Sequence, residues 1–263
     1  SNNNLKQLIN KGIQLVEEGT LEKIVLAARV KIAFKNKLNI IQILKKLKTF
    51  QPNTCRYVWR RNSKDIIFGA SPEKLFSFNK PYLTLEAIAG TVSSDLNSNS
   101  LLESSKDVKE HNYVIQYLIH CLEVLKIKNY SKSALKVTSF GDISHLQTLL
   151  CSKIDNICPF DLMKILHPSP AVCGSPKKEA MNWINTLESF SRENYASPIG
   201  WVDSEGNSEF RVAIRGARYI DQNLEFTAGA GLVKGSIAKK EIEEIQLKIK
   251  SLVKQIFIAE TTK

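Results

Sequence analysis

Two groups of short alternating segments constrain the fold of this chain more than any other feature. Within each segment apolar and polar residues alternate, and breaks such as Asn-Ser-Lys, Ser-Pro and Asn-Lys-Pro interrupt the first group. Such alternation is typical of strands with one buried face, and the breaks are typical of turns. We therefore predict two antiparallel meanders. The first comprises residues 56–60, 65–69, 74–78 and 82–89, and the second comprises residues 197–202, 209–220 and 223–227.

Helical periodicity occupies much of the sequence outside the meanders. Leu5, Leu8 and Ile13, for example, recur at the spacing of one helix face. We expect a single α+β domain over residues 1–263, with two antiparallel β-sheets packed together and helices on the outside. Helices are predicted at residues 4–18, 40–47, 105–126, 159–166, 177–187 and 239–258, and further strands at residues 21–34, 135–140 and 145–150.

The composition is that of an ordinary globular protein. Of the 263 residues, 43% are hydrophobic and 24% are charged, and no apolar run approaches the ~20 residues of a membrane helix. The polar N-terminus lacks the basic-then-apolar order of a signal peptide, so we expect a cytoplasmic protein. The five cysteines are scattered and form no CxxC pair, which favours reduced, mostly buried thiols over a disulfide framework or a zinc ribbon.

The net charge of +11 leaves several partners open. Strong basicity is compatible with nucleic-acid binding, but the lysines are spread along the chain and no recognised nucleic-acid motif accompanies them. A basic surface also suits an anionic small-molecule substrate, and a Lys-, Asn- and Ile-rich composition can reflect nucleotide bias alone. Charge therefore does not decide between these functions.

The last third of the chain carries a cluster of anion-binding and charged residues. An alternating strand ends at Arg215, a glycine-rich turn follows at residues 228–235, and a helix then presents Glu241, Glu244 and Lys248. Glycines allow backbone N–H groups to approach an anion, an arginine can bind a carboxylate with two hydrogen bonds, and paired glutamates can hold Mg²⁺. Together these residues predict a pocket for a small anion that is bound partly through a metal.

Further motifs precede this cluster and carry a family resemblance. The blocks SPExL, AGT, KDxxEH, HPxPAVxG, IGW, EFxVAIR and AGAGLVxGS occur in this order between Leu21 and Ile249. With them the chain resembles the chorismate-utilising enzymes, which comprise isochorismate synthases, salicylate synthases and the large subunits of anthranilate and aminodeoxychorismate synthases. The resemblance implies a chorismate-binding catalytic domain over residues 1–263, with an N-terminal helix in residues 1–20 and a matching core in residues 21–258.

The resemblance implies acid–base chemistry on chorismate. A nucleophile attacks C2 of the ring while the C4 hydroxyl leaves, which needs a base on one face and an acid on the other. In the water-using members a lysine activates water and a glutamate protonates the leaving hydroxyl, and Lys23 and Glu73 occupy these positions. On the residues alone, Lys23 would more often be a surface lysine with its charged end in solvent.

The resemblance also implies a Mg²⁺ site. Glu110 of KDVKEH and Glu244 correspond to metal-binding glutamates, and Glu241 lies one helical turn before Glu244 on the same face. The ion would hold the ring carboxylate of chorismate and neutralise its charge. On the residues alone, a solvated acidic helix face that pairs with Lys248 is the more frequent explanation.

The remaining expected site residues surround the substrate. Arg215 and Tyr195 are expected to bind the enolpyruvyl carboxylate, with help from a nest of backbone N–H groups in the glycine-rich turn. His145 corresponds to a family histidine near the ring, whereas His111 and His167 are expected to be structural. The expected substrate-binding residues are Gly90, Thr91, His145, Tyr195, Arg215, Gly229, Ala230, Gly231 and Lys248.

Two positions discriminate between the members of the family. Ala89 stands where covalent aminodeoxychorismate synthases carry a nucleophilic lysine, and Lys23 stands where ammonia-using anthranilate synthases lack one. Both favour water as the nucleophile, and hence an isomerase of the isochorismate synthase class (chorismate hydroxymutase) without a glutamine amidotransferase subunit. We expect a monomer that serves menaquinone or phylloquinone biosynthesis rather than a siderophore, and salicylate synthase is the alternative activity.

One departure from the family leaves other classes of function open. Family members are usually longer, with an N-terminal portion that completes both sheets, so we expect this chain to lack that part. A non-catalytic, truncated chorismate-binding domain and a basic nucleic-acid binder are therefore alternatives. The intact set of Lys23, Glu73, Glu110 and Glu244 favours the enzyme, because neither alternative requires all four residues.

Overall fold

The computed structural model describes residues 2–34, 38–94 and 99–257, and these form two antiparallel sheets with helices packed on them. Ser1 and Ile258, at the ends of the predicted domain and helix, lie outside the described residues. The helices are α1 (Asn2–Glu17), α2 (Ile40–Phe50), α3 (Ser100–Glu103), α4 (Ser105–Val124), α5 (Pro159–Leu166), α6 (Lys177–Leu187) and α7 (Ala238–Phe257).

The strands belong to two sheets, and consecutive strands form blocks that lie in one sheet or the other. The first sheet has the order β2-β3-β12-β13-β1-β9, and the second has the order β10-β11-β4-β5-β8-β6, with β7 also paired to β8. The strands are β1 (Lys23–Ala33), β2 (Cys55–Asn62), β3 (Asp65–Ser71), β4 (Lys74–Asn79), β5 (Tyr82–Ser93), β6 (Ser131–Lys132), β7 (Lys136–Phe140), β8 (Ile143–Lys153), β9 (Gly174–Ser175), β10 (Pro198–Val202), β11 (Ser208–Val212), β12 (Gly216–Ile220) and β13 (Asn223–Val233).

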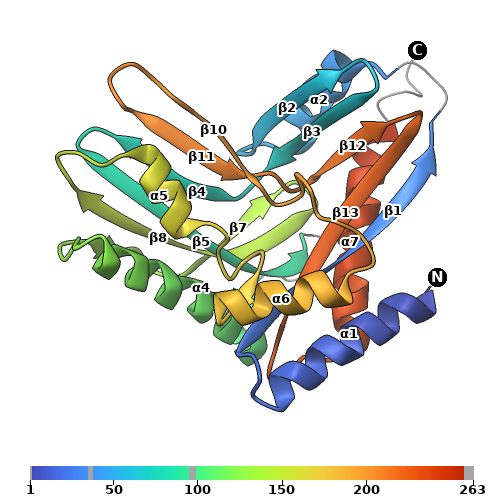
Figure 1. Ribbon diagram of the computed structural model, residues 1–263, viewed down its shortest axis with the longest axis horizontal. Helices are drawn as coiled ribbons and strands as arrows, with labels where there is room; N and C mark the ends of the chain where they lie inside the picture. Colours follow the sequence, from blue (N-terminus) through green and yellow to red (C-terminus); the bar gives the residue numbers. More distant parts are fainter. Residues whose placement is uncertain (1, 35–37, 95–98, 258–263) are drawn as a thin grey trace.

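Neither predicted meander lies in a single sheet, and this corrects the sequence analysis. In the first group, β2 and β3 pair in the first sheet, whereas β4 and β5 pair in the second. In the second group, β10 and β11 belong to the second sheet, whereas β12 and β13 belong to the first. The predicted strand at residues 209–220 is therefore two strands, and the chain crosses between the sheets at residues 72–73 and again at residues 213–215 (Figure 1).

The two crossovers lie side by side and are joined by hydrogen bonds. The backbone N–H of Val212 donates to Glu73 O at 3.1 Å, and that of Ala70 donates to Arg215 O at 3.0 Å. The Ser71 hydroxyl adds a bond to Val212 O at 2.6 Å. At the crossovers the backbone N–H and C=O groups have no partner in a neighbouring strand, and these bonds satisfy them instead. The bonds also fix Glu73 and Arg215 relative to each other.

Three apolar clusters hold the helices against the sheets. Leu118 and Leu122 of α4 pack with Leu85 and Leu150 of the second sheet. A second cluster joins α1, α6 and α7 to β1 and β13, and a third joins α2 and α7 to β3 and β12. Figure 1 shows α7 along β13 and α4 along the second sheet, so both helices that carry the predicted metal ligands lie against strands of the core.

One smaller prediction about the chain was also wrong. Only Cys121 and Cys173 are buried, while Cys151 and Cys158 are exposed and Cys55 is half-buried, so the free thiols are not mostly buried. The AGT block lies in β5, where the register with β8 shifts between Ala89 and Val92. Within the described part of the chain, every helix is too short or too polar to cross a membrane.

Candidate active site

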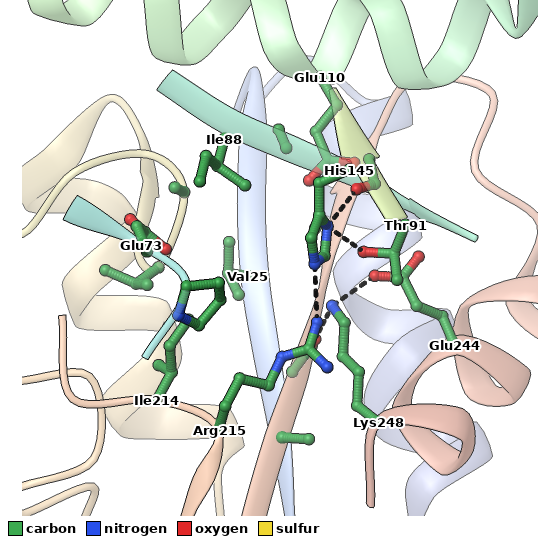
Figure 2. Close-up of a pocket in the computed structure, with 18 of the residues that line it drawn as sticks. Val25, Glu73, Ile88, Thr91, Glu110, His145, Ile214, Arg215, Glu244 and Lys248 are labelled. Carbon is green, nitrogen blue, oxygen red and sulfur yellow. Dashed lines mark hydrogen bonds and ion pairs between the residues drawn. The ribbon is translucent and has the colours of Figure 1, made fainter. Parts of the chain in front are cut away.

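A pocket open to solvent lies where both crossovers meet α4, α7 and strands of the two sheets (Figure 2). It is concave and lined by both apolar and charged side chains, as sites for small molecules are. Of the predicted site residues, Lys23, Ala230 and Glu241 do not line it. The predicted residues that do are Glu73, Gly90, Thr91, Glu110, His145, Tyr195, Arg215, Gly229, Gly231, Glu244 and Lys248.

Glu73 is a buried carboxyl group on the first crossover. Its side chain lies across the pocket from Glu110, Glu244 and Lys248 (Figure 2). Burial raises the pKa of Glu73 to about 7, and the negative charge of Glu86 adds to the effect, against the opposing charges of Lys23, Lys248 and Arg215. A carboxyl group with this pKa is still partly protonated at neutral pH and can donate its proton, as a general acid must.

Arg215 reaches the pocket from the second crossover rather than from a strand. Its backbone has a φ of +56°, which turns the chain sharply between β11 and β12. Its Nη2 donates to His145 Nε2 at 2.9 Å, and His145 Nδ1 lies 2.7 Å from Gly90 O. Because Arg215 donates, His145 must accept at Nε2, so His145 is neutral and carries its proton on Nδ1.

The environment of His145 agrees with the neutral form. Burial, followed by the charges of Arg215 and Lys248, lowers the pKa of His145 well below its ordinary value. Thr91 Oγ1 is a second polar neighbour, 3.3 Å from Nδ1. Gly90 has a φ of +71° at the β5 irregularity, where it presents its carbonyl to the imidazole. His145 therefore connects the AGT segment to the guanidinium of Arg215.

The residues of the AGAGLV block form a strand, and the predicted glycine-rich turn is confined to residues 234–235. Gly229, Ala230 and Gly231 pair with β1 in regular antiparallel register, and neither glycine has a positive φ. Pairing with β12 ends at Phe226, so β12 does not cover the far edge of the following residues. Gly229 O accepts a bond from Lys248 Nζ at 2.8 Å, whereas Ala230 packs into an apolar cluster.

Gly231 is required by the packing of a carboxylate against the strand. A Cβ atom added there would lie 2.0 Å from Glu110 Oε1 and 3.0 Å from Lys23 Cε. The absent side chain thus leaves the space in which Glu110 meets Lys23. The glycine acts through this close approach, and the sequence analysis had assigned it to a backbone nest.

Lys23 is fully buried behind the pocket and pairs with Glu110. Its Nζ lies 3.1 Å from Glu110 Oε1, and its side chain has no exposed surface. The surface lysine considered on the residues alone is therefore excluded. Burial raises the pKa of Glu110, but the charges of Lys23 and Lys106 outweigh it and hold the pKa well below its ordinary value.

Lys106 is the centre of an acidic cluster that the sequence analysis did not predict. Its Nζ lies 3.3 Å from Glu110 Oε2, 3.2 Å from Glu241 Oε1 and 3.6 Å from Asp107 Oδ1. Burial raises the pKa of Glu241 to about 7; Lys106 opposes this shift, and Glu244 and Glu110 add to it. The i,i+4 spacing of Lys106 and Glu110 within KDVKEH is the signal that could have found this lysine.

The donor set of the predicted metal site has the chemistry of a cation site. Glu110, Glu241 and Glu244 supply carboxylate oxygens, which Mg²⁺ prefers, and Glu241 is only 3% exposed, so the solvated acidic face is excluded for that residue. The carboxylates contact lysines in this structure: Glu110 and Glu241 contact Lys106, and Glu244 pairs with Lys248 at 2.6 Å. Among the described residues no three potential ligands are close enough to bind one ion.

Tyr195 lines the pocket beside an arginine that was not predicted. Burial raises the pKa of Tyr195 to about 12, although the nearby Arg192 opposes the shift. Arg192 donates to Val25 O at 2.7 Å and to Val172 O at 2.6 Å, and it also pairs with Glu188. Val25 and Val172 both line the pocket, so Arg192 fixes two of its sides.

The two histidines expected to be structural make interior hydrogen bonds away from the pocket. His111 Nε2 lies 2.9 Å from Thr148 Oγ1, and burial lowers the pKa of His111 to about 4. His167 Nε2 lies 2.7 Å from Ala196 O, and the backbone of His167 is extended before Pro168. Neither is among the residues that line the pocket.

Comparisons with known proteins agree with this arrangement. A family model described as "Chorismate binding enzyme" matches residues 1–257. The chain is 29% identical over 257 residues to the vibriobactin-specific isochorismate synthase of Vibrio cholerae, covering 94% of this chain and 65% of the relative. It is 31% identical over 247 residues to the isochorismate synthase MenF of Bacillus subtilis, covering 90% of this chain and 52% of that protein.

A solved structure shares the fold. The menaquinone-specific isochorismate synthase MenF of Escherichia coli superposes with a TM-score of 0.86 at 25% identity, over 97% of this chain and 61% of that one. The chain thus spans between about half and two thirds of the length of the relatives it matches.

Proposed function

The chain belongs to the family of chorismate binding enzymes, and on this premise we propose that it is an isochorismate synthase, a magnesium-dependent isomerase that converts chorismate into isochorismate. The observation that carries the proposal is the position of Glu73, a buried carboxyl with a pKa of about 7, across the pocket from Glu110 and Lys248. Relatives named isochorismate synthases, similar over most of this chain, support it.

The proposed substrate is a dicarboxylate, and the pocket offers cations for both of its acidic groups. We assign Arg215 and Tyr195 to the enolpyruvyl carboxylate, together with the backbone of Gly229 and Gly231 on the edge of β13 that β12 leaves open. Lys248, on the adjacent helix α7, is assigned to a substrate carboxylate as well. Binding by a neutral His145 orients Arg215 without adding a charge to the pocket.

The proposed reaction replaces one hydroxyl group by another. Lys23 takes a proton from water, and the resulting hydroxide forms a bond to C2 of the ring. The double bonds shift as the bond from C4 to its hydroxyl breaks, and Glu73 donates the proton that lets this hydroxyl leave as water. Lys23 lies behind Glu110 in this structure, so it needs access to the pocket in the reacting complex.

We assign the metal to Glu110, Glu241 and Glu244. A bound Mg²⁺ supplies positive charge that holds the ring carboxylate and neutralises it. The protein's own contribution is to bury these carboxylates beside Lys106 and Lys248, which balance part of their charge.

The choice of water as nucleophile rests on two residues. Ala89 stands on β5 where a lysine nucleophile would be needed for a covalent adduct, and Lys23 supplies a base. We therefore propose that the enzyme acts without a glutamine amidotransferase subunit. We further propose that it is a monomer located in the cytoplasm. We propose menaquinone biosynthesis as its pathway, and the likeness to the menaquinone-specific MenF of Escherichia coli supports this choice.

The decisive experiment incubates the protein with chorismate and Mg²⁺ without an ammonia donor and separates the products by chromatography. Isochorismate is the expected product, and it should be lost in Glu73→Gln but retained in Glu179→Gln, an exposed glutamate on α6. Salicylate with pyruvate would assign the chain to the salicylate synthases. Chorismate binding without any product would identify a non-catalytic binding domain, and salt-sensitive binding to RNA or DNA without chorismate binding would overturn the family assignment of function.

A further inference from the structure

Glu86 is a second half-buried carboxylate close to Glu73, on strand β5, and nothing in the reaction described above uses it. We propose that Glu86, held by Gln147, is a positioning residue that fixes the peptide following Glu73 and keeps the proton on Glu73 rather than on itself. The proposal deepens the proposed function and rests on it for the catalytic role of Glu73.

Glu86 helps to hold one peptide group beside Glu73 in place. The peptide that joins Glu73 to Lys74 is bound on both sides: its N–H donates to Glu86 Oε2 at 3.2 Å, and its C=O accepts from Val212 N at 3.1 Å. The Ser71 hydroxyl also donates to this carbonyl at 3.3 Å. A peptide plane fixed at both ends limits the rotation of the Glu73 backbone, and therefore the directions available to its side chain.

The other oxygen of Glu86 is held by a side chain of strand β8. Gln147 Nε2 donates to Glu86 Oε1, and Thr138 Oγ1 donates to Gln147 Oε1 at 2.8 Å. Because the hydroxyl of Thr138 fills the acceptor side of the amide, the donor side of Gln147 is directed at Glu86. Both carboxylate oxygens thus accept hydrogen bonds, which stabilises the ionised form of Glu86.

The two carboxyl groups differ in what opposes their burial. Burial leaves the pKa of Glu86 raised above its ordinary value, and the bonds from Gln147 and Lys74 N and the charges of Lys74 and Arg211 reduce that shift. For Glu73, burial and the charge of Glu86 both raise the pKa, to about 7, and the charges of Lys23, Lys248 and Arg215 only reduce the shift. Unequal environments of this kind separate the proton affinities of two neighbouring carboxyls, so that one is ionised and the other protonated.

The substitution Glu86→Gln is expected to change the titration midpoint of Glu73 in one direction only. The amide keeps the size of the side chain and can still accept the bond from Lys74 N, but it removes the negative charge that favours the proton on Glu73. The titration midpoint of Glu73 should therefore fall by about 0.5 to 1 pH unit. Since the acid form of Glu73 is the active one, the alkaline limb of the kcat profile should move to lower pH by the same amount, with KM little changed at pH 6.

The test measures the Glu73 carboxyl directly by ¹³C NMR titration of glutamate-labelled protein, with Glu73→Gln to assign its resonance. Glu179→Gln serves as the control and should leave the midpoint unchanged. Gln147→Met is a second variant, which keeps the charge of Glu86 but removes the amide that donates to it. We expect it to lower the titration midpoint of Glu73 by less than Glu86→Gln does. Because the titration needs no turnover, it tests the proposal even if the protein yields no isochorismate.

An unchanged Glu73 midpoint in a folded Glu86→Gln protein would overturn the proposal, as would an upward shift. If Glu86→Gln does not fold, Gln147→Met decides by the same criterion. A kcat loss that is equal at pH 6 and pH 8, without a shift of the limb, would show that Glu86 supports the structure only.

Discussion

Glu73 is a residue whose chemical role and stabilising role have opposite requirements. As the proposed acid it must be buried to hold its proton, yet burial makes its ionisation costly to the folded protein. Glu73→Gln keeps the shape and removes the proton donor, so we expect kcat to fall by at least about 100-fold while the Kd for chorismate changes by less than about threefold. Single-turnover kinetics and calorimetric titration measure the two quantities, and full activity of the variant would refute the assignment.

The same substitution should stabilise the protein at alkaline pH. In the folded protein the pKa of Glu73 is raised to about 7 from an ordinary 4.5, so the folded state binds more protons than the unfolded state between these values. Stability is therefore lost as the pH rises through this window. We expect Glu73→Gln to gain up to about 3 kcal/mol over the parent at pH 8 and almost nothing at pH 4.5, as measured by urea unfolding.

Lys106 supplies the next prediction, because its ammonium is the cation that the acidic cluster contacts in this structure. A bound dication would have to share Glu110 and Glu241 with it. Removing this charge in Lys106→Met should tighten Mg²⁺ binding by about tenfold and lower the Tm of the metal-free protein, since the carboxylates then repel one another. Isothermal titration with MgCl₂ measures the first effect, and differential scanning calorimetry measures the second.

The matched control is Lys109→Met, which removes an exposed lysine from the same helix. It should leave both the affinity and the Tm within error, because a solvated charge at the surface interacts weakly. Weaker Mg²⁺ binding in Lys106→Met than in the parent would mean that Lys106 supports the metal site.

At the scale of the elements, periodicity predicted what lies within each strand and helix, and it missed where the chain changes sheets. The helix at residues 177–187 was predicted with the bounds that α6 has, because its apolar face repeats without interruption. The strand at residues 209–220 was not divided, since Ala213 and Ile214 continue an apolar run through the crossover. Sequence patterns report burial on either side of such a break, and the pairing partners are set by long-range contacts.

The candidate site was predicted in its residues more than in its geometry. The family resemblance identified eleven residues that line the pocket, and seven of them lie in the motif blocks themselves. Glu86 and Arg192 were missed, since each acts on a neighbour that is distant in sequence. Lys106 was missed although its i,i+4 spacing to Glu110 is a local signal, because its contact with Glu241 on α7 is distant in sequence. The glycines of β13 were misread as a turn, because Gly231 is required by the carboxylate of Glu110 and not by its own backbone.

The second crossover yields a prediction at this scale through Tyr57 on β2. Its hydroxyl donates to Ile214 O at 3.1 Å, and Gly69 and Gly216 leave room for it, since a Cβ on either would lie 2.6 Å from the oxygen. Tyr57→Phe removes the only side-chain bond among the described contacts to that carbonyl and should cost about 1 kcal/mol of stability.

Because Ile214 directly precedes Arg215, the loosened crossover should raise KM for chorismate by about threefold while kcat changes less. Steady-state kinetics and urea unfolding give the two numbers. Tyr82→Phe is the control, because Tyr82 is 60% exposed and lies at the start of β5 in the second sheet. A Tyr57→Phe protein with parental KM would show that the backbone bonds alone hold the crossover.

At the scale of the whole molecule, the net charge of +11 acquires a function only together with the pocket. Charge spread over the chain cannot select a ligand, but Lys248 and Arg215 collect positive charge at one concave site, where a dianion would be attracted. This combination is compatible with the basic composition and requires no nucleic-acid partner. Two electrostatic contributions to substrate binding then differ in their response to salt. Salt screens the long-range attraction of the substrate, and it screens the short-range contacts of the bound substrate much less.

The long-range contribution makes the last prediction. Raising NaCl from 0.05 to 0.5 M at saturating Mg²⁺ should lower kcat/KM for chorismate by about three- to tenfold, chiefly through KM, because the encounter of a dianion with a cationic protein is screened. The parent protein in sucrose of matched viscosity controls for slower diffusion and should lose much less. Arg215→Lys keeps the charge but loses the bidentate geometry, so it should raise KM at every salt concentration and leave the slope against ionic strength unchanged. A kcat/KM that does not respond to salt would show that net charge plays no part in capture, and that the pocket residues act only after contact.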